Sequence, residues 1–274
     1  MKEYTKIYNC LNLPQAAIGL ALGELQVPNG VEDQPAQCYG FPPAMIPLWS
    51  NPDSMTYTGI WKHWFSNRTA SFIRMYVNTN YRLKEIARNF HQLAQYIILE
   101  EISFSKNVTD EIALFAENLG VSNLRELDQL SIESGDDPKG LFHLPTFKDE
   151  SPLICFDDLH QYKGDFPNIN LPLNSMNMKV TCSLELTEIL ERHYICSNDC
   201  PAWFYSKKQK ELFYSYLSAG SLSEAWFTLN SNGWLFKDAK PALEQLASKA
   251  NNRDFNLLTE AWNSLKHDKY KEGY

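Results

Sequence analysis

The chain has 274 residues, a length that accommodates one large domain or two ordinary ones. Hydrophobic residues make up 44% and charged residues 21% of the sequence, so we expect a packed core and exclude wholesale disorder. The 33 acidic residues outnumber the 25 basic residues, which gives a net charge of −8. This charge argues against general binding to nucleic acid, because phosphates need basic counter-charge. No apolar run approaches the ~18 residues that a membrane span requires.

The first segment, up to about residue 80, predicts three short strands. They cover residues 45–49, 57–65 and 70–77, which are rich in β-branched and aromatic side chains and are separated by turn-forming residues. Connections this short imply antiparallel neighbours. Upstream, residues 16–25 predict a short packed helix followed by a turn.

Residues 83–99 show the clearest helical pattern in the chain. Apolar side chains recur there at three- and four-residue spacing, as expected for a helix laid on a core. A second helix is predicted over about 110–119, where Gly120 provides a stop, and a short third helix from Asn123. The residues of the first apolar stripe are Leu83, Ile86, Ala87, Phe90, Leu93, Ala94, Ile97 and Ile98.

Residues 136–180 lack periodicity and predict an irregular connector. Recurring prolines and a turn-rich stretch at 134–140 interrupt any regular element. We expect this connector to pack through apolar side chains, namely Phe142, Phe147, Ile154, Phe156 and Tyr162.

The last ninety or so residues predict a small helical bundle. Capping-box spacings begin at Ser206 and Ser221, and Pro241 is expected in the first turn of a further helix. Phe255, Leu258, Trp262 and Leu265 form a final apolar stripe. The expected fold class is therefore α+β, with a small antiparallel sheet, a covering helix and a helical C-terminal unit. The expected units are 1–135, 136–180 and 181–274.

The N-terminal residues show no unbroken apolar stretch and no cleavage site, so no signal peptide is predicted. Six cysteines spread over a long chain are typical of reduced, buried thiols rather than of a disulfide framework. We therefore expect a cytoplasmic protein.

One group of residues has the chemistry of a zinc site. Cys182, His193, Cys196 and Cys200 carry the thiolate and imidazole ligands that zinc prefers. Their spacing is irregular, however, and the cysteines also fit the pattern of small buried groups. We expect no cofactor, and a zinc-supported interaction module stays an alternative.

A second group has the chemistry of acid–base catalysis. Asp157 and Asp158 stand beside His160, but adjacent aspartates also cap helices and turns. His63, which alternates with Trp61 and Phe65, is interpreted as a half-buried structural histidine. Phosphate-loop, dinucleotide, nucleophile-elbow and zinc-protease motifs are missing from the sequence. We expect a binding protein without enzymatic activity. The alternative is a hydrolase that uses Asp157, Asp158 and His160.

The charge layout is the most informative feature. Residues 100–150 contain twelve acidic and four basic residues, so this fifth of the chain carries the whole excess of −8. A solvated acidic face is one explanation of such a run. The other is a local negative potential that speeds encounter with a basic partner.

Part of the chain resembles the SUKH superfamily of bacterial immunity proteins. The resemblance rests on an order of motifs: Gly-Phe-Pro-Pro at 40–43, Ile-Pro-Leu-Trp-Ser at 46–50, the aromatic segment 57–65, and Glu-Ile-Ala-Arg-Asn-Phe at 85–90. It covers roughly residues 40–99, and the chain departs from it at Trp49 and in its long helical tail. The resemblance implies a protein that binds and neutralises a toxin, often a nuclease, delivered by neighbouring cells.

Together these features predict a protein that occludes a basic toxin and makes or breaks no bonds. Nuclease toxins carry basic clefts, which an acidic, aromatic-bearing surface complements. We expect no binding to nucleic acid or membrane. The residues expected to contact the partner are Asp110, Glu111, Glu117, Glu126, Asp128, Asp136, Asp137, Trp61 and Trp64.

Overall fold

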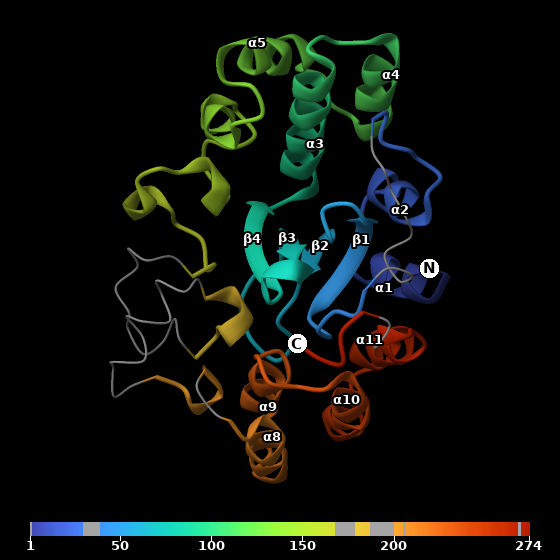
Figure 1. The fold of residues 1–274 in the computed structure, drawn as a ribbon, viewed down its shortest axis with the longest axis vertical. Helices are drawn as coiled ribbons and strands as arrows, with labels where there is room; N and C mark the ends of the chain where they lie inside the picture. The colour runs from blue at the N-terminus through green and yellow to red at the C-terminus, as the bar shows by residue number, and fades with distance from the viewer. Residues whose placement is uncertain (1, 30–38, 168–178, 187–199, 205–206, 268–269) are drawn as a thin grey trace.

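A four-stranded antiparallel sheet lies in the middle of the molecule, with helices on either side (Figure 1). The strands are β1 (Met45–Asn51), β2 (Thr56–Trp61), β3 (Ser71–Tyr76) and β4 (Arg82–Ala87), and each pairs with the next along the chain. This confirms the predicted α+β fold class. The structure, a computed structural model, describes residues 2–29, 39–167, 179–186, 200–204, 207–267 and 270–274.

The predicted start of the helix over 83–99 is wrong, because residues 82–87 form strand β4. In this strand Leu83 pairs with Met75, and Ile73 pairs with Glu85. Arg82 and Lys84 are exposed while Leu83 and Glu85 are buried, which is the two-residue alternation expected of a strand with one face toward the solvent. The apolar residues at 83, 86 and 87 have helical spacing by coincidence, and this spacing continues into the stripe of the helix that starts at Phe90.

Helix α3 (Phe90–Ser105) begins at a reciprocal cap. The Asn89 side chain accepts a hydrogen bond from the backbone N–H of Gln92 (3.0 Å), and Gln92 Oε1 accepts one from the backbone N–H of Arg88 (2.8 Å). The first bond satisfies a donor that the first turn of a helix leaves unpaired, and the second ties the residue before the cap to that turn. The cap therefore fixes the boundary between β4 and α3.

Helices α4 (Asp110–Leu119) and α5 (Leu124–Ser134) confirm the second and third predicted helices. Thr109 caps α4 by accepting a hydrogen bond from the backbone N–H of Ile112 (3.2 Å), and Gly120 ends it with a φ of 74°. Both helices contact α3 at the end of the molecule remote from the C-terminal helices (Figure 1).

The C-terminal part is helical, as predicted. Pro241 lies inside α10 rather than in its first turn, because the helix already starts at Phe236. Among the described helices, none combines the length and the apolar character needed to cross a membrane. The remaining α-helices are α1 (Thr5–Cys10), α2 (Gln15–Leu22), α8 (Gln209–Ser218), α9 (Leu222–Leu229), α10 (Phe236–Ala250) and α11 (Arg253–Asn263). The 3-10 helices are η1 (Lys2–Tyr4), η3 (Val77–Thr79), η4 (Pro138–His143), η5 (Leu153–Cys155), η6 (Leu159–Gln161), η7 (Ser183–Glu185) and η8 (Ala202–Phe204).

The main hydrophobic core of the described residues includes side chains from Tyr4 to Tyr274, and a small second cluster holds Leu186 and Cys200. The division into three units stays a prediction. Long-range hydrogen bonds tie the C-terminal helices to the sheet: Trp262 Nε1 donates to the carbonyl of Phe41 (2.9 Å), and the backbone N–H of Ala44 donates to Asn230 Oδ1 (2.7 Å). The described part of the connector packs on this core through the five predicted side chains, of which Phe147 and Tyr162 are buried.

Candidate functional site

Helices α4 and α5 place the predicted acidic residues at one end of the molecule (Figure 1). Asp110, Glu111 and Glu117 lie on α4 and are exposed. On α5 and just after it, Glu126 and Asp136 are exposed, whereas Asp128 and Asp137 are partly exposed. We refer to these residues as the acidic end, that is Asp110, Glu111, Glu117, Glu126, Asp128, Asp136 and Asp137.

Two other carboxylates of residues 100–150 are used inside the fold. Glu100 forms a two-pronged ion pair with Arg74, with N–O distances of 2.7 and 2.8 Å. Glu101 is buried and accepts hydrogen bonds from the backbone and side chain of Asn29. Asp137 lies 4.0 Å from Lys139, which also pairs with Asp157. Within the described part of the chain, no salt bridge involves the five acidic-end carboxylates on α4 and α5.

Exposed apolar side chains accompany these acids. Phe104 on α3 is 74% exposed, Leu114 on α4 is 60% exposed, and Ile132 on α5 is 72% exposed. Large apolar side chains in such numbers mark interaction sites when they gather in one region. No sequence motif marks these three side chains, although Leu114 lies off the buried stripe of α4, one turn from both Glu111 and Glu117.

A groove runs beside α4 at this end of the molecule. It has a volume of about 500 Å³ and lies between α4 and residues 24–28. Leu25, Leu114 and Phe115 give it apolar walls, and the carboxylates of Glu24 and Glu111 line it as well. Such a groove suits a protein segment that carries both apolar and basic side chains.

The structure corrects the expectation that Trp61 and Trp64 anchor a partner. Trp61 is 1% exposed and Trp64 is 9% exposed, so both belong to the core. Trp64 packs against Phe255 of α11, with ring centroids 5.4 Å apart. Trp64 therefore helps to attach α11 to the sheet, while Trp61 contacts His63 of the buried interior, with ring centroids 5.8 Å apart.

A cluster of ionisable side chains is buried where residues 181–186 cross the end of β2. The guanidinium of Arg68 forms a salt bridge with the carboxylate of Glu185, and His63 Nε2 lies 3.0 Å from Glu185 Oε2. The backbone N–H of Cys182 donates to the same oxygen (2.8 Å). We call His63, Arg68, Cys182 and Glu185 the buried cluster; each is at most 8% exposed.

The pKa values in the buried cluster give it a balanced charge. Burial alone would raise the pKa of Glu185, but the Arg68 guanidinium and the His63 imidazole outweigh burial and lower it to about 2. Burial lowers the pKa of His63 and raises the pKa of the Cys182 thiol. At neutral pH one carboxylate therefore faces one guanidinium, beside an uncharged imidazole and an uncharged thiol.

The buried cluster contains three metal-ligating groups, but its carboxylate is already paired with a cation. Ligand atoms of His63, Cys182 and Glu185 lie within 4.8 Å of one another, and zinc accepts all three types. Arg68, however, neutralises the carboxylate, and the ring N–H of Trp61 points at His63 Nε2 (3.1 Å). That nitrogen cannot accept from Trp61 and donate to Glu185 at once, and the ionised carboxylate is the stronger partner. We assign the cluster a structural role.

The other candidates for chemistry are dispersed. Cys200 is buried beside Leu186 and Phe204, away from the main core that holds Cys182, while the other two predicted zinc ligands, His193 and Cys196, lie outside the described residues. Asp157 pairs with Lys139 at 2.5 Å. The carboxylate of Asp158 accepts a hydrogen bond from the backbone N–H of His160 (3.1 Å), and this bond does not involve the imidazole. The contact of Asp158 is that of a turn, the alternative that the sequence left open, and Asp157 is held in an exposed ion pair.

Comparison with family models, curated proteins and solved structures returns no match to this chain. The resemblance to the SUKH superfamily therefore stays a prediction, and function has to be inferred from the acidic end and the surfaces around it.

The buried ion pair predicts a large effect of Arg68→Met on stability. Removing the guanidinium leaves the Glu185 carboxylate charged in a buried site, which typically costs about 3–5 kcal/mol. Urea unfolding at pH 7 measures the loss. The matched control is Lys210→Met, which breaks the exposed pair with Asp238 and should leave the free energy of unfolding nearly unchanged, because solvent screens that pair. Equal effects of the two substitutions would contradict the assignment.

The lowered pKa of Glu185 predicts acid sensitivity. Between pH 4.5, the ordinary value, and about 2, the unfolded chain binds a proton that the folded protein does not bind. Stability is therefore complete above pH 4.5 and falls as the pH drops, by up to ~1.4 kcal/mol per pH unit from this group. The double variant Arg68→Met/Glu185→Gln should lose this component of the slope in urea unfolding at pH 5, 4 and 3, while Glu260→Gln on the surface of α11 should keep it.

Proposed function

We propose that this protein is an immunity-type binding protein that occludes a basic protein toxin with its acidic end. The observation that carries the proposal is the coincidence of unpaired carboxylates with exposed apolar side chains on α3, α4 and α5. Carboxylates steer a basic partner toward the surface, and apolar side chains hold it once docked.

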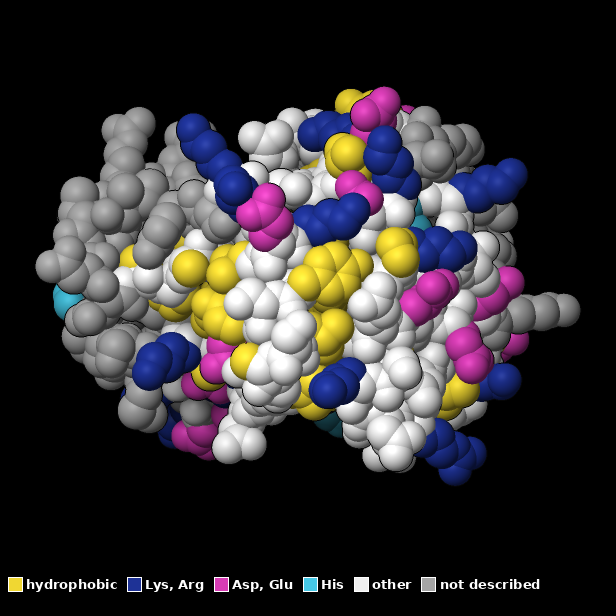
Figure 2. Space-filling view, turned by 90° about the horizontal axis from the view of Figure 1, so that it is seen from below, with side chains coloured by type: hydrophobic (Ala, Val, Ile, Leu, Met, Phe, Trp, Pro, Cys, Tyr) yellow, Lys and Arg dark blue, Asp and Glu magenta, His cyan; other side chains and the backbone are white. Residues whose placement is uncertain are grey.

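The opposite end of the molecule carries no comparable excess of negative charge. Helices α8–α11, residues 209–263, carry five basic and six acidic residues, a net charge of −1. Figure 2 looks onto this end and shows basic and acidic side chains interspersed around a group of hydrophobic ones. A basic partner is therefore drawn to the acidic end rather than to the C-terminal helices.

The groove beside α4 supplies a place for an inserted segment of the partner. Its apolar walls at Leu25, Leu114 and Phe115 lie next to the carboxylates of Glu24 and Glu111. A lysine or arginine side chain can pack its aliphatic stem on the wall while its charged group meets a carboxylate. A toxin that presents a basic, partly apolar segment fits this arrangement.

The toxin class follows from charge and from the resemblance at residues 40–99. Nuclease domains need basic clefts for the phosphates of their substrates, and blocking such a cleft stops the reaction without any chemistry by the inhibitor. Immunity by occlusion therefore requires only binding.

Charge reversal tests the steering role of α4. The triple variant Asp110→Lys/Glu111→Lys/Glu117→Lys should slow association with the toxin at least tenfold at low salt and flatten the salt dependence of the rate. The measurement uses the basic protein that a pulldown with this chain recovers from the source organism, with rates from surface binding at two or more salt concentrations.

The matched control reverses three exposed acids of the C-terminal helices, Glu211, Glu244 and Glu260, which changes the net charge equally. This variant should keep most of the association rate and should still protect cells that express the toxin. A control that slows association as much as the α4 variant, or an α4 variant that still protects, would refute the proposal.

Leu114→Ser tests the apolar contact. Losing a buried apolar contact at the centre of an interface costs more than about 1 kcal/mol, so the dissociation rate should rise about tenfold. The free protein should keep its stability within about 0.5 kcal/mol, because Leu114 is exposed before binding. Tyr270→Ser, an exposed aromatic elsewhere, serves as the control and should leave dissociation unchanged.

A further inference from the structure

A second cavity has the opposite charge to the acidic end. It has a volume of about 290 Å³, close to the lower limit of roughly 300–1,000 Å³ for small-molecule sites. Arg88, Lys148 and Lys163 line it, together with a single carboxylate, Asp149. The lining therefore carries a formal charge of +2 in a protein whose net charge is −8. We call it the cationic cavity.

The buried carboxyl of Glu85 interacts electrostatically with Arg88, but no ion pair cancels the three cations within the described residues. Among the residues that the structure describes, no salt bridge involves the side chain of Arg88, Lys148 or Lys163. The nearby carboxyl of Glu85 does not line the cavity: it is buried and accepts a hydrogen bond from the backbone N–H of Leu153 (2.8 Å).

The beginning of helix α3 adds to the positive potential. Arg88 stands two residues before the first residue of α3, and Gln92 in the first turn donates to the carbonyls of Thr146 and Glu150 (3.0 Å each). These bonds hold residues 146–150, and with them Lys148, against the N-terminal turn. The N-terminus of a helix of this length attracts anions.

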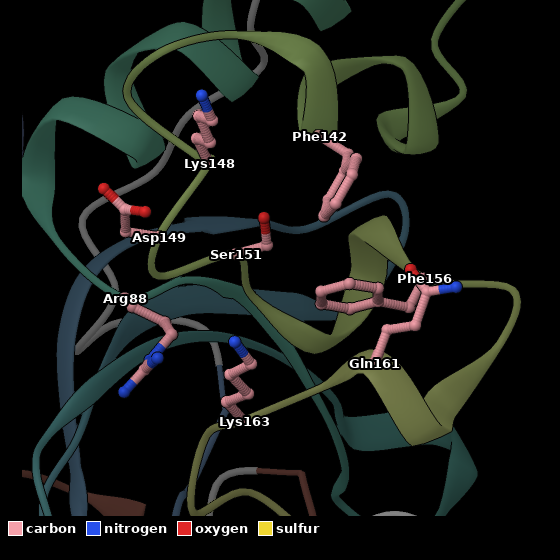
Figure 3. Close-up of a pocket in the computed structure, with 8 residues that line it drawn as sticks. All are labelled: Arg88, Phe142, Lys148, Asp149, Ser151, Phe156, Gln161 and Lys163. Atoms are coloured by element: carbon pink, nitrogen blue, oxygen red, sulfur yellow. The ribbon is translucent and has the colours of Figure 1, made fainter.

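Aromatic rings form another wall of the cationic cavity. Phe142 and Phe156 line it and contact each other, with ring centroids 5.4 Å apart. In Figure 3 the ammonium group of Lys163 extends toward the middle of the lining residues, with both rings on the far side of it. Arg88 lies beside Lys163 with its guanidinium turned away from the rings, and the charged ends of Lys148 and Asp149 also point away from the middle (Figure 3). Lys163 is therefore the inner cation, and the half-buried Arg88 is the cation next to it.

We propose that the cationic cavity binds a small molecule that joins a phosphate monoester to a planar ring. A phosphate monoester carries a charge of about −1.5 to −2 at neutral pH, which matches the lining charge. The Arg88 guanidinium can meet two phosphate oxygens, Lys163 a third, and the ring packs on Phe142 and Phe156. This site is separate from the acidic end, and it stands whether or not the toxin proposal holds.

Titration calorimetry of the full chain with phenyl phosphate tests the site. We expect saturable binding that is several-fold tighter than that of inorganic phosphate, because only phenyl phosphate carries the ring. Phenol should not bind measurably. Arg88→Gln and Lys163→Gln should each weaken phenyl phosphate binding about tenfold, the effect of losing one charge-assisted contact.

Two further variants make the test specific. Asp149→Asn removes the opposing charge at the rim and should strengthen binding about two- to threefold. Lys237→Gln removes an exposed cation of α10, remote from the cavity, and should change nothing. Asp149 and Lys163 are exposed, so these variants remain informative if Arg88→Gln does not fold. Absence of saturable binding, equal weakening by Lys237→Gln, or weaker binding with Asp149→Asn would overturn the proposal. Equal affinity for inorganic phosphate would overturn the ring contact.

Discussion

The contact of Arg68 with Glu185 joins parts of the chain that are more than a hundred residues apart, and much of the remaining structure depends on it. Residues 181–186 bring the buried carboxylate of Glu185 to the turn that follows β2. There Arg68 supplies a cation for it, and the imidazole of His63 lies beside it. The backbone N–H of Cys182 donates a hydrogen bond to the same carboxylate. The hydrogen bond of Ser183 to Ser231 (3.0 Å) extends this contact to the end of α9. The C-terminal helices thus share the main hydrophobic core with the sheet.

This arrangement decides which charges remain for binding. Arg68 and Arg74 are both used in ion pairs inside the fold, with Glu185 and Glu100. The carboxylates of α4 and α5 find no such partners in the described residues, so their charge reaches the solvent. Burial also removes Trp61 and Trp64 from any surface, and the exposed apolar residues that remain near the acids are Phe104, Leu114 and Ile132. The interface that we propose therefore differs in its apolar residues, though not in its charges, from the one that the sequence predicts.

Local patterns predicted the fold well, and long-range contacts account for what they missed. The strands around residues 45, 57 and 71 and the helix over 110–119 follow from spacing and turn residues alone. Strand β4 does not, because Leu83, Ile86 and Ala87 fit a helical stripe, and only pairing with β3 makes residues 82–87 a strand. The buried cluster could not be predicted from the sequence either. The pattern around His63 indicates a structural histidine, but nothing near Glu185 in the sequence indicates that its carboxylate contacts Arg68 and His63. The cationic cavity combines Arg88 with Lys163, and no spacing relates the two.

Helix α3 connects the two proposed binding sites and also keeps them electrically apart. Its N-terminal turn holds residues 146–150, which include two residues of the cationic cavity, and its C-terminal turn carries Phe104 at the acidic end. Sixteen residues span roughly 24 Å, about three times the screening length of roughly 8 Å at physiological salt. The helix dipole favours the same separation, with anions at the N-terminus and cations at the C-terminus. A phosphorylated ligand and a basic protein are therefore attracted to opposite ends of one helix, and neither field weakens the other. Any coupling between the two sites has to pass through the packing of α3, which contacts β4 at one end and α4 and α5 at the other.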